Sequence, residues 1–173
     1  MIFETERLYF RELRADDFDN LCKILKDEET MYAYEGAFDD AMVSEWLDRQ
    51  IARYKTYGFG MWAVILKESG EMIGQCGLTM QEWNGEEVLE VGYLFRRDFW
   101  HKGYATKAAR ACMDYAFEVL HAKEVCSIIR DTNIPSQNVA RRNGMIKLPG
   151  VMVKYYRGVE MPHERFVKRR ENL

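Results

Sequence analysis

Hydrophobic positions alternate with polar ones over residues 7–13, as they do in a short strand with one buried face. Apolar residues then recur three or four positions apart over residues 16–26, which predicts a helix. The same spacing returns after Asp39 or Asp40, either of which can cap a second helix that ends near Gly58. The chain is therefore expected to open as strand, helix, helix.

Three apolar runs follow, at residues 61–67, 72–80 and 88–95. Turn sequences separate them, first around Gly70 and then at Asn84-Gly85. Apolar and β-branched runs divided by such turns are typical of antiparallel strands joined by hairpins. The middle of the chain therefore predicts a three-stranded meander.

The second half alternates between the two kinds of element. Its pattern predicts a helix over 104–120, a strand over 125–130, a helix over 135–143 and two last strands on either side of Gly158. A long helix between strands implies a parallel step within a mixed sheet. We expect an α/β (α+β) fold of three layers: a mixed, mostly antiparallel central sheet of about seven strands, with helices on both faces.

Length and composition narrow the class of protein. The 173 residues hold 47% hydrophobic and 31% charged residues with no linker or repeat, which predicts one folded domain over 1–173. No apolar run approaches the roughly 18–20 residues needed to cross a bilayer, so we expect a cytoplasmic protein without a membrane partner. Four cysteines without a C-x-x-C pair predict reduced thiols and no metal. The three histidines are expected in structural or surface roles.

Charge is unevenly distributed along the chain. Residues 1–50 hold 14 acids and 6 bases, whereas residues 139–173 hold 9 bases and 3 acids. The acidic region suits a cationic substrate, and the basic region either suits phosphates or balances the acidic half. The acidic pI of about 5.7 argues against direct nucleic-acid binding.

The most specific chemistry follows the third apolar run. Gly103 and Ala105 leave room at the start of a helix, where unpaired backbone N–H groups bind anions such as a pyrophosphate. Small residues at 105, 108, 109, 112 and 116 form a stripe that allows this helix to pack closely on the sheet. Gly92, in the middle of the preceding strand, predicts a bulge or close backbone approach that separates the strand from its neighbour and frees N–H groups.

Three segments resemble the Gcn5-related N-acetyltransferase (GNAT) family. Trp100-His101-Lys102-Gly103-Tyr104-Ala105-Thr106 resembles its acyl-CoA pyrophosphate loop, and 89–93 resembles the bulged strand before that loop. Residues 133–145 resemble its N-x-x-S helix. The RimJ/RimL-type subgroup (ribosomal-protein-alanine N-acetyltransferase-like) is the most similar, because its members also open like Glu4-Thr5-Glu6-Arg7-Leu8.

The resemblance implies the GNAT fold and transfer of acetyl from acetyl-CoA to a primary amine by direct attack on the thioester. It implies these cofactor contacts: Phe95, Arg97, Trp100, His101, Lys102, Gly103, Tyr104, Ala105, Thr106, Asn133, Ser136, Asn138 and Arg142. The chain departs from the family at Ala140, where many relatives have a tyrosine acid, and near Tyr155, where some RimL-type proteins have a proposed glutamate base. Those two catalytic roles therefore do not transfer.

Two other residues are candidates for catalysis. Glu90 is the candidate base, because it lies on the strand beside the expected carbonyl site; the alternative is a solvated or salt-bridged strand glutamate. Ser136 is the candidate donor to the departing thiolate, and helix capping is its alternative.

The acceptor amine is expected to meet the connection 28–38 and the hairpin near Gly158, where aromatic rings beside carboxylates suit a cation. A loop anchored by its tyrosines is the alternative. The predicted acceptor contacts are Met31, Tyr32, Tyr34, Glu35 and Tyr93.

Three functions stay open. The leading hypothesis is acetylation of a protein or peptide N-terminal amine by a monomer or homodimer. The second has a polyamine, an aminoglycoside or another small amine as acceptor, and the third is a non-catalytic acyl-CoA-binding module. A nicotinamide-binding fold is excluded, because no G-x-G-x-x-G follows the first strand.

Overall fold

A computed structural model describes residues 1–34 and 36–171. No helix in these ranges combines the length and apolar character that a membrane span requires. The elements follow the chain in this order: β1 (Phe3–Glu4), β2 (Leu8–Glu12), the 3-10 helix η1 (Ala15–Asp17), α1 (Phe18–Leu25), α2 (Glu28–Met31), α3 (Asp40–Tyr57), β3 (Met61–Leu66), β4 (Met72–Trp83), β5 (Glu86–Phe95), the 3-10 helix η2 (Arg97–Phe99), α4 (Tyr104–Glu118), β6 (Glu124–Arg130), α5 (Ile134–Arg142), β7 (Ile146–Lys147), β8 (Met152–Tyr156) and β9 (Val159–Arg169).

The strands in the described part of the chain form one mixed sheet. Its order is β1-β2-β3-β4-β5-β6-β9-β7, and β8 pairs with β9 outside this path. Every recorded pairing is antiparallel except that of β5 with β6. The expected three-layer fold and each of the seven expected strands are confirmed, and β1 and β7 add two strands of two residues each.

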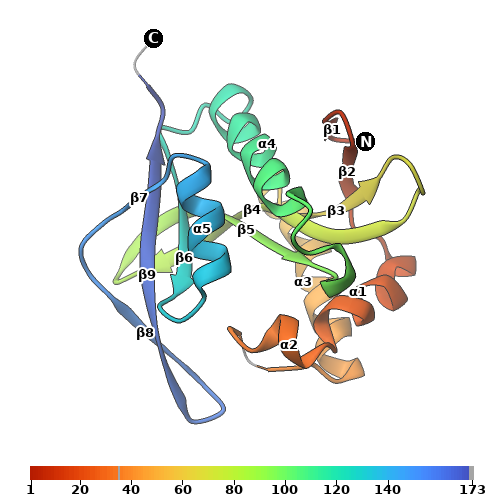
Figure 1. The fold of residues 1–173 in the computed structure, drawn as a ribbon, viewed down its shortest axis with the longest axis horizontal. Coiled ribbons are helices and arrows are strands. Elements are labelled where there is room, and N and C mark those ends of the chain that lie inside the picture. Colours follow the sequence, from red (N-terminus) through yellow and green to blue (C-terminus); the bar gives the residue numbers. More distant parts are fainter. Residues whose placement is uncertain (35, 172–173) are drawn as a thin grey trace.

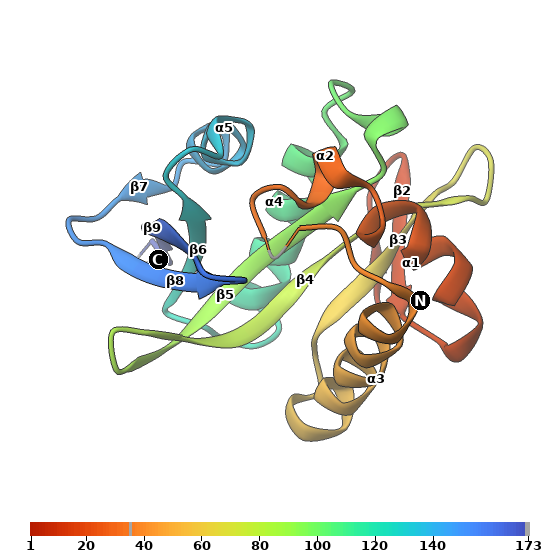
Figure 2. The same ribbon diagram turned by 90° about the horizontal axis from the view of Figure 1, so that it is seen from below.

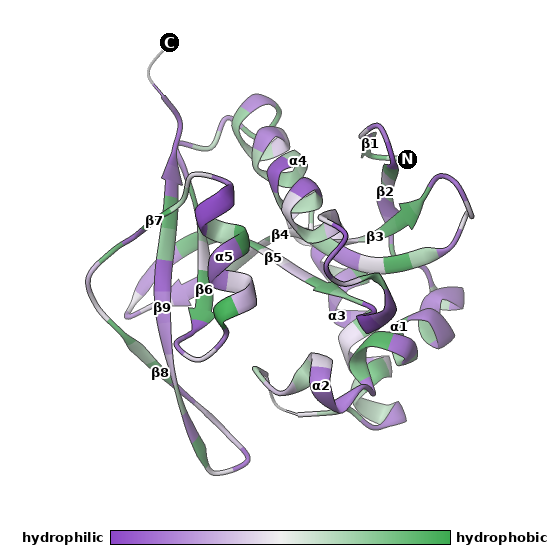
Figure 3. Cartoon of the chain, in the orientation of Figure 1, coloured by the Kyte–Doolittle hydropathy of each residue, from purple (hydrophilic) through white to green (hydrophobic). Residues whose placement is uncertain are grey.

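Helices cover both faces of the sheet (Figures 1 and 2). On one face α4 and α5 pack on a core that includes Phe10, Trp62 and Val91. On the other face α1 and α3 pack on Ala63, Ile65 and other residues of the second core. All six residues of β3 are buried between these helix layers. Both sides of this strand are accordingly hydrophobic (Figure 3).

The small-residue stripe on α4 faces the sheet as predicted. Ala108, Ala109, Cys112 and Ala116 are at most 2% exposed and belong to the first core. With no long side chain between them, the helix backbone lies close to β4 and β5. The packing fixes where the first turn of α4 lies relative to the end of β5.

One local expectation was wrong, and one short helix was not predicted. No bulge exists at Gly92, because the register of β4 with β5 runs unbroken from Gly74↔Phe95 to Trp83↔Glu86. The separation lies on the other edge of β5, which pairs with β6 at the single position Glu90↔Cys126. The connection 28–38 also contains the short helix α2, which the carboxylate of Asp27 caps by accepting the Thr30 N–H.

Gly77 and Gly92 are directly paired across β4 and β5, but only Gly77 is crowded. A Cβ at Gly77 would lie 2.0 Å from the backbone oxygen of Gly60, whereas one at Gly92 would have no neighbour nearer than 3.7 Å. We therefore expect Gly77→Ala to lower the free energy of unfolding by about 1–2 kcal/mol, as other overpacked core positions do. Gly92→Ala is the matched control in urea unfolding, and equal losses in the two variants would contradict the close approach of Gly60.

Candidate active site

β5 and β6 part beyond their single paired position, and backbone groups of β5 face the opening. The Arg96 N–H donates to the Ile73 oxygen at 2.9 Å, which continues the ladder between β4 and β5. Because bonding directions alternate along an antiparallel pair, the N–H groups of Tyr93 and Phe95 are turned away from β4. They therefore point to the side of β5 on which β6 diverges.

Two side-chain bonds cross between β5 and β6 where the strands separate. The Ser127 hydroxyl donates to the Val91 oxygen at 2.9 Å, and the Ile128 N–H donates to Glu90 Oε2 at 2.9 Å. The Glu90 carboxylate thus takes the place of the backbone oxygen that would accept the Ile128 N–H in a regular sheet. Glu90 is held in place at the edge of the opening.

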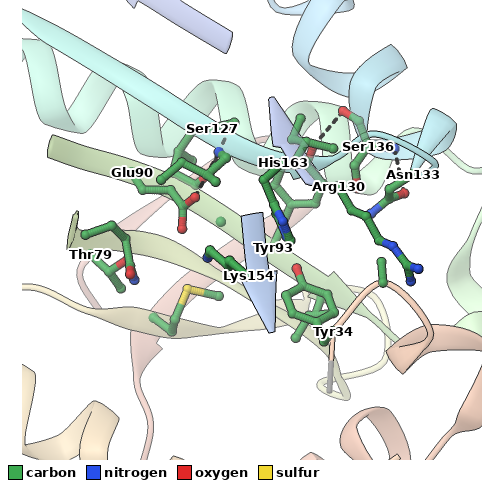
Figure 4. A pocket seen from close by; sticks show the side chains of 18 of the residues that line it. Tyr34, Thr79, Glu90, Tyr93, Ser127, Arg130, Asn133, Ser136, Lys154 and His163 are labelled. Atoms are coloured by element: carbon green, nitrogen blue, oxygen red, sulfur yellow. Dashed lines mark hydrogen bonds between the residues drawn. The ribbon is translucent and has the colours of Figure 1, made fainter. Parts of the chain in front are cut away.

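Two cavities meet at this opening. The α4-side cavity, of about 410 Å³, lies against the first turn of α4. The α3-side cavity, of about 200 Å³, is lined by Glu90 and by residues of α3 and β8. Figure 4 shows the α3-side cavity, with Glu90 and Lys154 near each other and with Tyr34 and Tyr93 in its lining. The residues that line both cavities are Tyr34, Tyr93, Leu94, Asn133 and Ser136.

The start of α4, in the wall of the α4-side cavity, has the geometry of an anion site. Gly103 caps the helix with φ +80°, and no atom lies within 4 Å of the position that a Cβ would take. The first backbone bond runs from the Lys107 N–H to the Gly103 oxygen, so the N–H groups of residues 104–106 have no acceptor within the helix. Open space in front of unpaired donors at the positive end of a helix fits a pyrophosphate.

Three anchors hold this segment. The Trp100 indole N–H donates to the Phe95 oxygen at 2.9 Å, and the Asn143 amide donates to the Thr106 oxygen at 3.1 Å. The Arg7 guanidinium donates to the Tyr104 hydroxyl and lies 4.5 Å from the centre of its ring. The opening motif around Arg7 therefore contacts the start of α4, about a hundred residues further along the chain.

Most of the cofactor contacts expected from the sequence lie together. The following line the α4-side cavity: Phe95, Trp100, His101, Gly103, Tyr104, Ala105, Thr106, Asn133, Ser136, Asn138 and Arg142. Arg97 instead forms ion pairs of 2.9 and 2.7 Å with Asp27 and Glu29, which hold α2 against the loop. The Lys102 ammonium lies 5.2 Å from the ring centre of Phe99, outside the lining of the cavity.

Asn133 and Ser136 both form hydrogen bonds at the start of α5. Asn133 Oδ1 accepts the Ser136 N–H at 3.3 Å, so Asn133 caps α5. The Ser136 oxygen of the backbone accepts the Tyr93 hydroxyl at 2.9 Å. The side chain of Ser136 remains part of the lining shared by both cavities.

Glu90 is half-buried in the wall of the α3-side cavity. Burial raises the pKa of its carboxyl above the ordinary value, while Lys154, the Ile128 N–H and Arg53 act in the opposite direction. A carboxylate with a raised pKa accepts a proton more readily near neutral pH than an exposed one does. Glu90 therefore has the position and the environment of a general base.

The acceptor contacts expected from the sequence are only partly brought together. Tyr34 and Tyr93 lie between the two cavities, and Tyr32 lines the α4-side cavity. Met31 is 0% exposed in the second core and lines neither cavity, so it is not placed to contact a substrate. Glu35 lies outside the described residues.

The described acids of the connection 28–38, Glu28 and Glu29, line neither cavity. Glu90 is the carboxylate that the described residues contribute to the lining of the α3-side cavity. Other acids near the connection are used elsewhere: Asp27 pairs with Arg97, Asp39 caps α3, and Asp40 pairs with Lys26. These aspartates are therefore engaged in local ion pairs and helix caps and do not surround the cavity.

The sequence did not single out the cations of the α3-side cavity, which are Arg49, Arg53, Arg130 and Lys154. A signal was available on α3, where Trp46, Arg49 and Arg53 share one helical face. A second was available on β8, where the period of a strand places Lys154 on the same face as Met152 and Tyr156.

His163, expected to be structural or exposed, is 5% exposed and lines the α3-side cavity. Its Nδ1 lies 2.7 Å from the Met161 oxygen, which can only accept, so Nδ1 carries the hydrogen. Burial lowers the pKa of the ring; the bond to the Met161 oxygen opposes this shift, and Lys154 and Arg130 lower the pKa further. The imidazole is therefore neutral near pH 7, and Nε2 carries no proton.

Comparison with known proteins decides the family. Residues 7–146 match the sequence model of the Acetyltransferase (GNAT) domain. The chain belongs to the GNAT acetyltransferase family. As a GNAT protein it is an acyl-CoA-dependent acetyltransferase, and its chain is 35% identical over 142 residues to the uncharacterized protein YkkB of Bacillus subtilis, covering 82% of this chain and 83% of that one. It is 33% identical over 135 residues to the uncharacterized N-acetyltransferase p20 of Bacillus licheniformis, covering 76% and 75%.

Solved structures of acetyltransferases share the whole fold. An acetyltransferase from Agrobacterium tumefaciens superposes with a TM-score of 0.81 at 27% identity, covering 97% of this chain and 94% of that one. Two others are similar in fold alone, at 17% and 15% identity and TM-scores of 0.78 and 0.76. They are RimL, a ribosomal L7/L12 α-N-protein acetyltransferase in complex with CoA, covering 97% of each chain, and spermidine N-acetyltransferase from Vibrio cholerae in complex with CoA and spermine, covering 95% and 96%.

Proposed function

We propose that this GNAT protein transfers acetyl from acetyl-CoA to the α-amine of a protein or peptide, as RimJ/RimL-type enzymes do. The observation that carries the proposal is the meeting of two cavities at the opening between β5 and β6, with an anion site in one and Glu90 in the other. Acetyl-CoA supplies the activated acetyl group. Its entry from the α4 side leaves the α3 side for the amine.

The chain's own groups bind and orient the cosubstrate. The N–H groups of residues 104–106 bind the pyrophosphate, and Asn138 and Arg142 lie along the same cavity. The N–H groups of Tyr93 and Phe95 donate to the carbonyl oxygen at the opening. In other enzymes, removal of one such donor to a developing oxyanion costs about 2.7–4 kcal/mol.

Glu90 takes the proton from the amine, directly or through one water. An α-amine has an ordinary pKa of about 7.7–8.0, whereas that of a lysine amine is about 10.4. At about 1.36 kcal/mol per pKa unit, deprotonation near pH 7 costs a lysine about 3.5 kcal/mol more than an α-amine. A carboxylate base suits the α-amine better for this reason.

Ser136 is proposed as the hydrogen-bond donor to the departing sulfur. Its residue lines both cavities, whereas the Tyr93 hydroxyl already donates to the Ser136 backbone oxygen. The family's usual tyrosine position holds Ala140, which is 1% exposed and carries no donor. A thiol has an ordinary pKa of about 8.5, so the sulfur can depart as the thiolate, and a hydrogen bond from the hydroxyl stabilises the charge that develops on it.

The proposal predicts where the acetyl group appears. With acetyl-CoA, a peptide that contains both a free amino terminus and an internal lysine should be acetylated at the α-amine, with CoA thiol released in equal amount. Tandem mass spectrometry locates the acetyl group, and the same peptide with a blocked amino terminus is the control. Acetylation of the blocked peptide, or of spermidine in preference to every peptide, would overturn the α-amine proposal.

A further inference from the structure

Four cations line the α3-side cavity: Arg49, Arg53, Arg130 and Lys154. We refer to them as the cavity cations. They come from α3, the end of β6 and β8, so they face the same space from different sides of the fold. Glu90 is the carboxylate among the described residues that line this space, and His163 is neutral near pH 7. The lining therefore carries an excess of positive charge.

Three other cations that are buried or half-buried have carboxylate partners, which the cavity cations lack among the described residues. Arg11 pairs with Asp17 at 2.7 Å, Arg96 pairs with Glu71 and Asp98, and Arg165 pairs with Glu86 and Glu124. Within residues 1–34 and 36–171, none of the cavity cations forms an ion pair of 4.0 Å or less. Unpaired charge in a partly desolvated site is costly, so it is usually retained where a ligand supplies the counter-charge.

The neutral contacts of the cavity cations leave donors available. Arg130 donates one N–H to the Tyr32 oxygen at 2.7 Å, but its buried Nε has no hydrogen-bond partner among the described residues. Arg53 donates to the Gln50 amide oxygen at 3.0 Å, and Arg49 lies 6.0 Å from the Trp46 ring centre. Lys154 lies near Glu90 in Figure 4, and the two interact electrostatically.

We infer that the acceptor carries an anionic group close to its reactive amine, and that the cavity cations bind this group. The inference rests on the proposed function, and it narrows the acceptor to a peptide with an acidic or phosphorylated side chain within its first residues. Glu90 lies in the same cavity as the cations, so one small acceptor can present its amine to the carboxylate and its anion to the guanidinium groups. A polyamine has no group for them to bind and is repelled by them.

Matched peptides test the inference on the intact protein. Four peptides share the same first residue and length and differ at positions two and three, which hold glutamate, phosphoserine, glutamine or lysine. We expect kcat/KM for the glutamate or phosphoserine peptide to exceed that for the lysine peptide by about tenfold or more. Comparison of the glutamate peptide with the phosphoserine peptide shows whether the cavity cations prefer a carboxylate or a phosphate. The ratio of kcat/KM values between the acidic peptides and the lysine peptide should fall as salt is raised. Salt weakens the attraction between exposed charges, and at physiological ionic strength this attraction is largely screened beyond about 8 Å.

Charge removal locates the effect. Arg53→Gln and Lys154→Gln should each lower the ratio of acidic to glutamine peptide by about threefold or more. The ratio is the correct readout, because a change in the pKa of Glu90 affects both peptides equally. Lys55→Gln removes the same charge from an exposed position on α3 outside both cavities, so it should leave the ratio unchanged.

The outcomes separate the two proposals. Transfer to the glutamine peptide tests the proposed function alone, and its complete absence from all four peptides overturns that function and the inference with it. Transfer with equal or higher kcat/KM for the lysine peptide overturns the inference and leaves α-amine acetylation intact. A ratio that falls equally in Lys55→Gln also overturns it, because the effect would then come from the charge of the whole protein.

Discussion

Replacing Glu90 with glutamine is expected to lower kcat by about 10²-fold or more while acetyl-CoA affinity stays unchanged. General bases contribute about 10²–10⁴-fold in other enzymes. The amide keeps the shape of the carboxyl, and its oxygen can still accept the Ile128 N–H that now bonds Glu90 Oε2. It cannot take a proton from the amine. The opening between β5 and β6 should therefore persist while the proton transfer is lost.

The pH dependence of this variant gives a second readout. Activity requires the carboxylate form of Glu90, so the rate of the parent should decrease as pH falls through the raised pKa of that group. The amine must also be deprotonated, which adds its own decrease on the same side. The parent should show both ionisations below the optimum, and Glu90→Gln should retain only that of the amine.

Glu87→Gln is the matched control for this experiment. Glu87 is exposed on the same strand, lines neither cavity and should be replaceable without effect on kcat. If Glu90→Gln and the parent had superimposable pH–rate profiles, Glu90 would return to a purely structural role, as the acceptor of the Ile128 N–H between two diverging strands.

Gly103→Val should weaken acetyl-CoA binding by roughly 10- to 100-fold. The side chain would fill the open space in front of the N–H groups of residues 104–106 and keep the pyrophosphate from them. Loss of one hydrogen bond to a charged group costs about 1.5–3 kcal/mol, and each 1.4 kcal/mol is a factor of ten in affinity. Calorimetric titration with acetyl-CoA measures the change.

Gly103→Val could weaken binding in two ways: the side chain could block the pyrophosphate, or the positive φ could strain the backbone. A control variant must separate these two effects. Gly85 has φ +87° and, like Gly103, no atom within 4 Å of an added Cβ, but it lies in the hairpin between β4 and β5. Gly85→Val therefore carries the same strain without contact with either cavity. Equal affinities in Gly103→Val and Gly85→Val would place the pyrophosphate somewhere other than the start of α4.

The sequence was sufficient for the parts of the site that depend on local geometry. A glycine and small residues at a helix start, followed by the stripe through Ala108 and Cys112, determine both the geometry of the candidate anion site and its distance from the sheet. Hydrophobic periodicity likewise located every strand of four or more residues. These patterns act within a few residues of one another, so they can be identified without tertiary contacts.

The parts that depend on distant segments could not be predicted in this way. Gly92 predicts a bulge or a close backbone approach, but the register of β4 with β5 is unbroken there, and β5 separates instead from β6, with which it pairs only at Glu90↔Cys126. The acids of the amino-terminal region suggested a cationic substrate, but Arg97 neutralises Asp27 and Glu29 from seventy or so residues away. The charge of the α3-side cavity comes instead from arginines and a lysine on three separate elements.

The most direct test of the account is a crystal structure with a bisubstrate analogue, in which the sulfur of CoA is joined through an acetyl bridge to the α-nitrogen of a peptide with an acidic second residue. The account predicts the pyrophosphate at the N–H groups of residues 104–106, the bridge at the opening beside Tyr93 and Phe95, and the peptide in the α3-side cavity with its α-nitrogen near Glu90. A pyrophosphate bound away from α4, or a peptide that leaves through the same side as CoA, would contradict it.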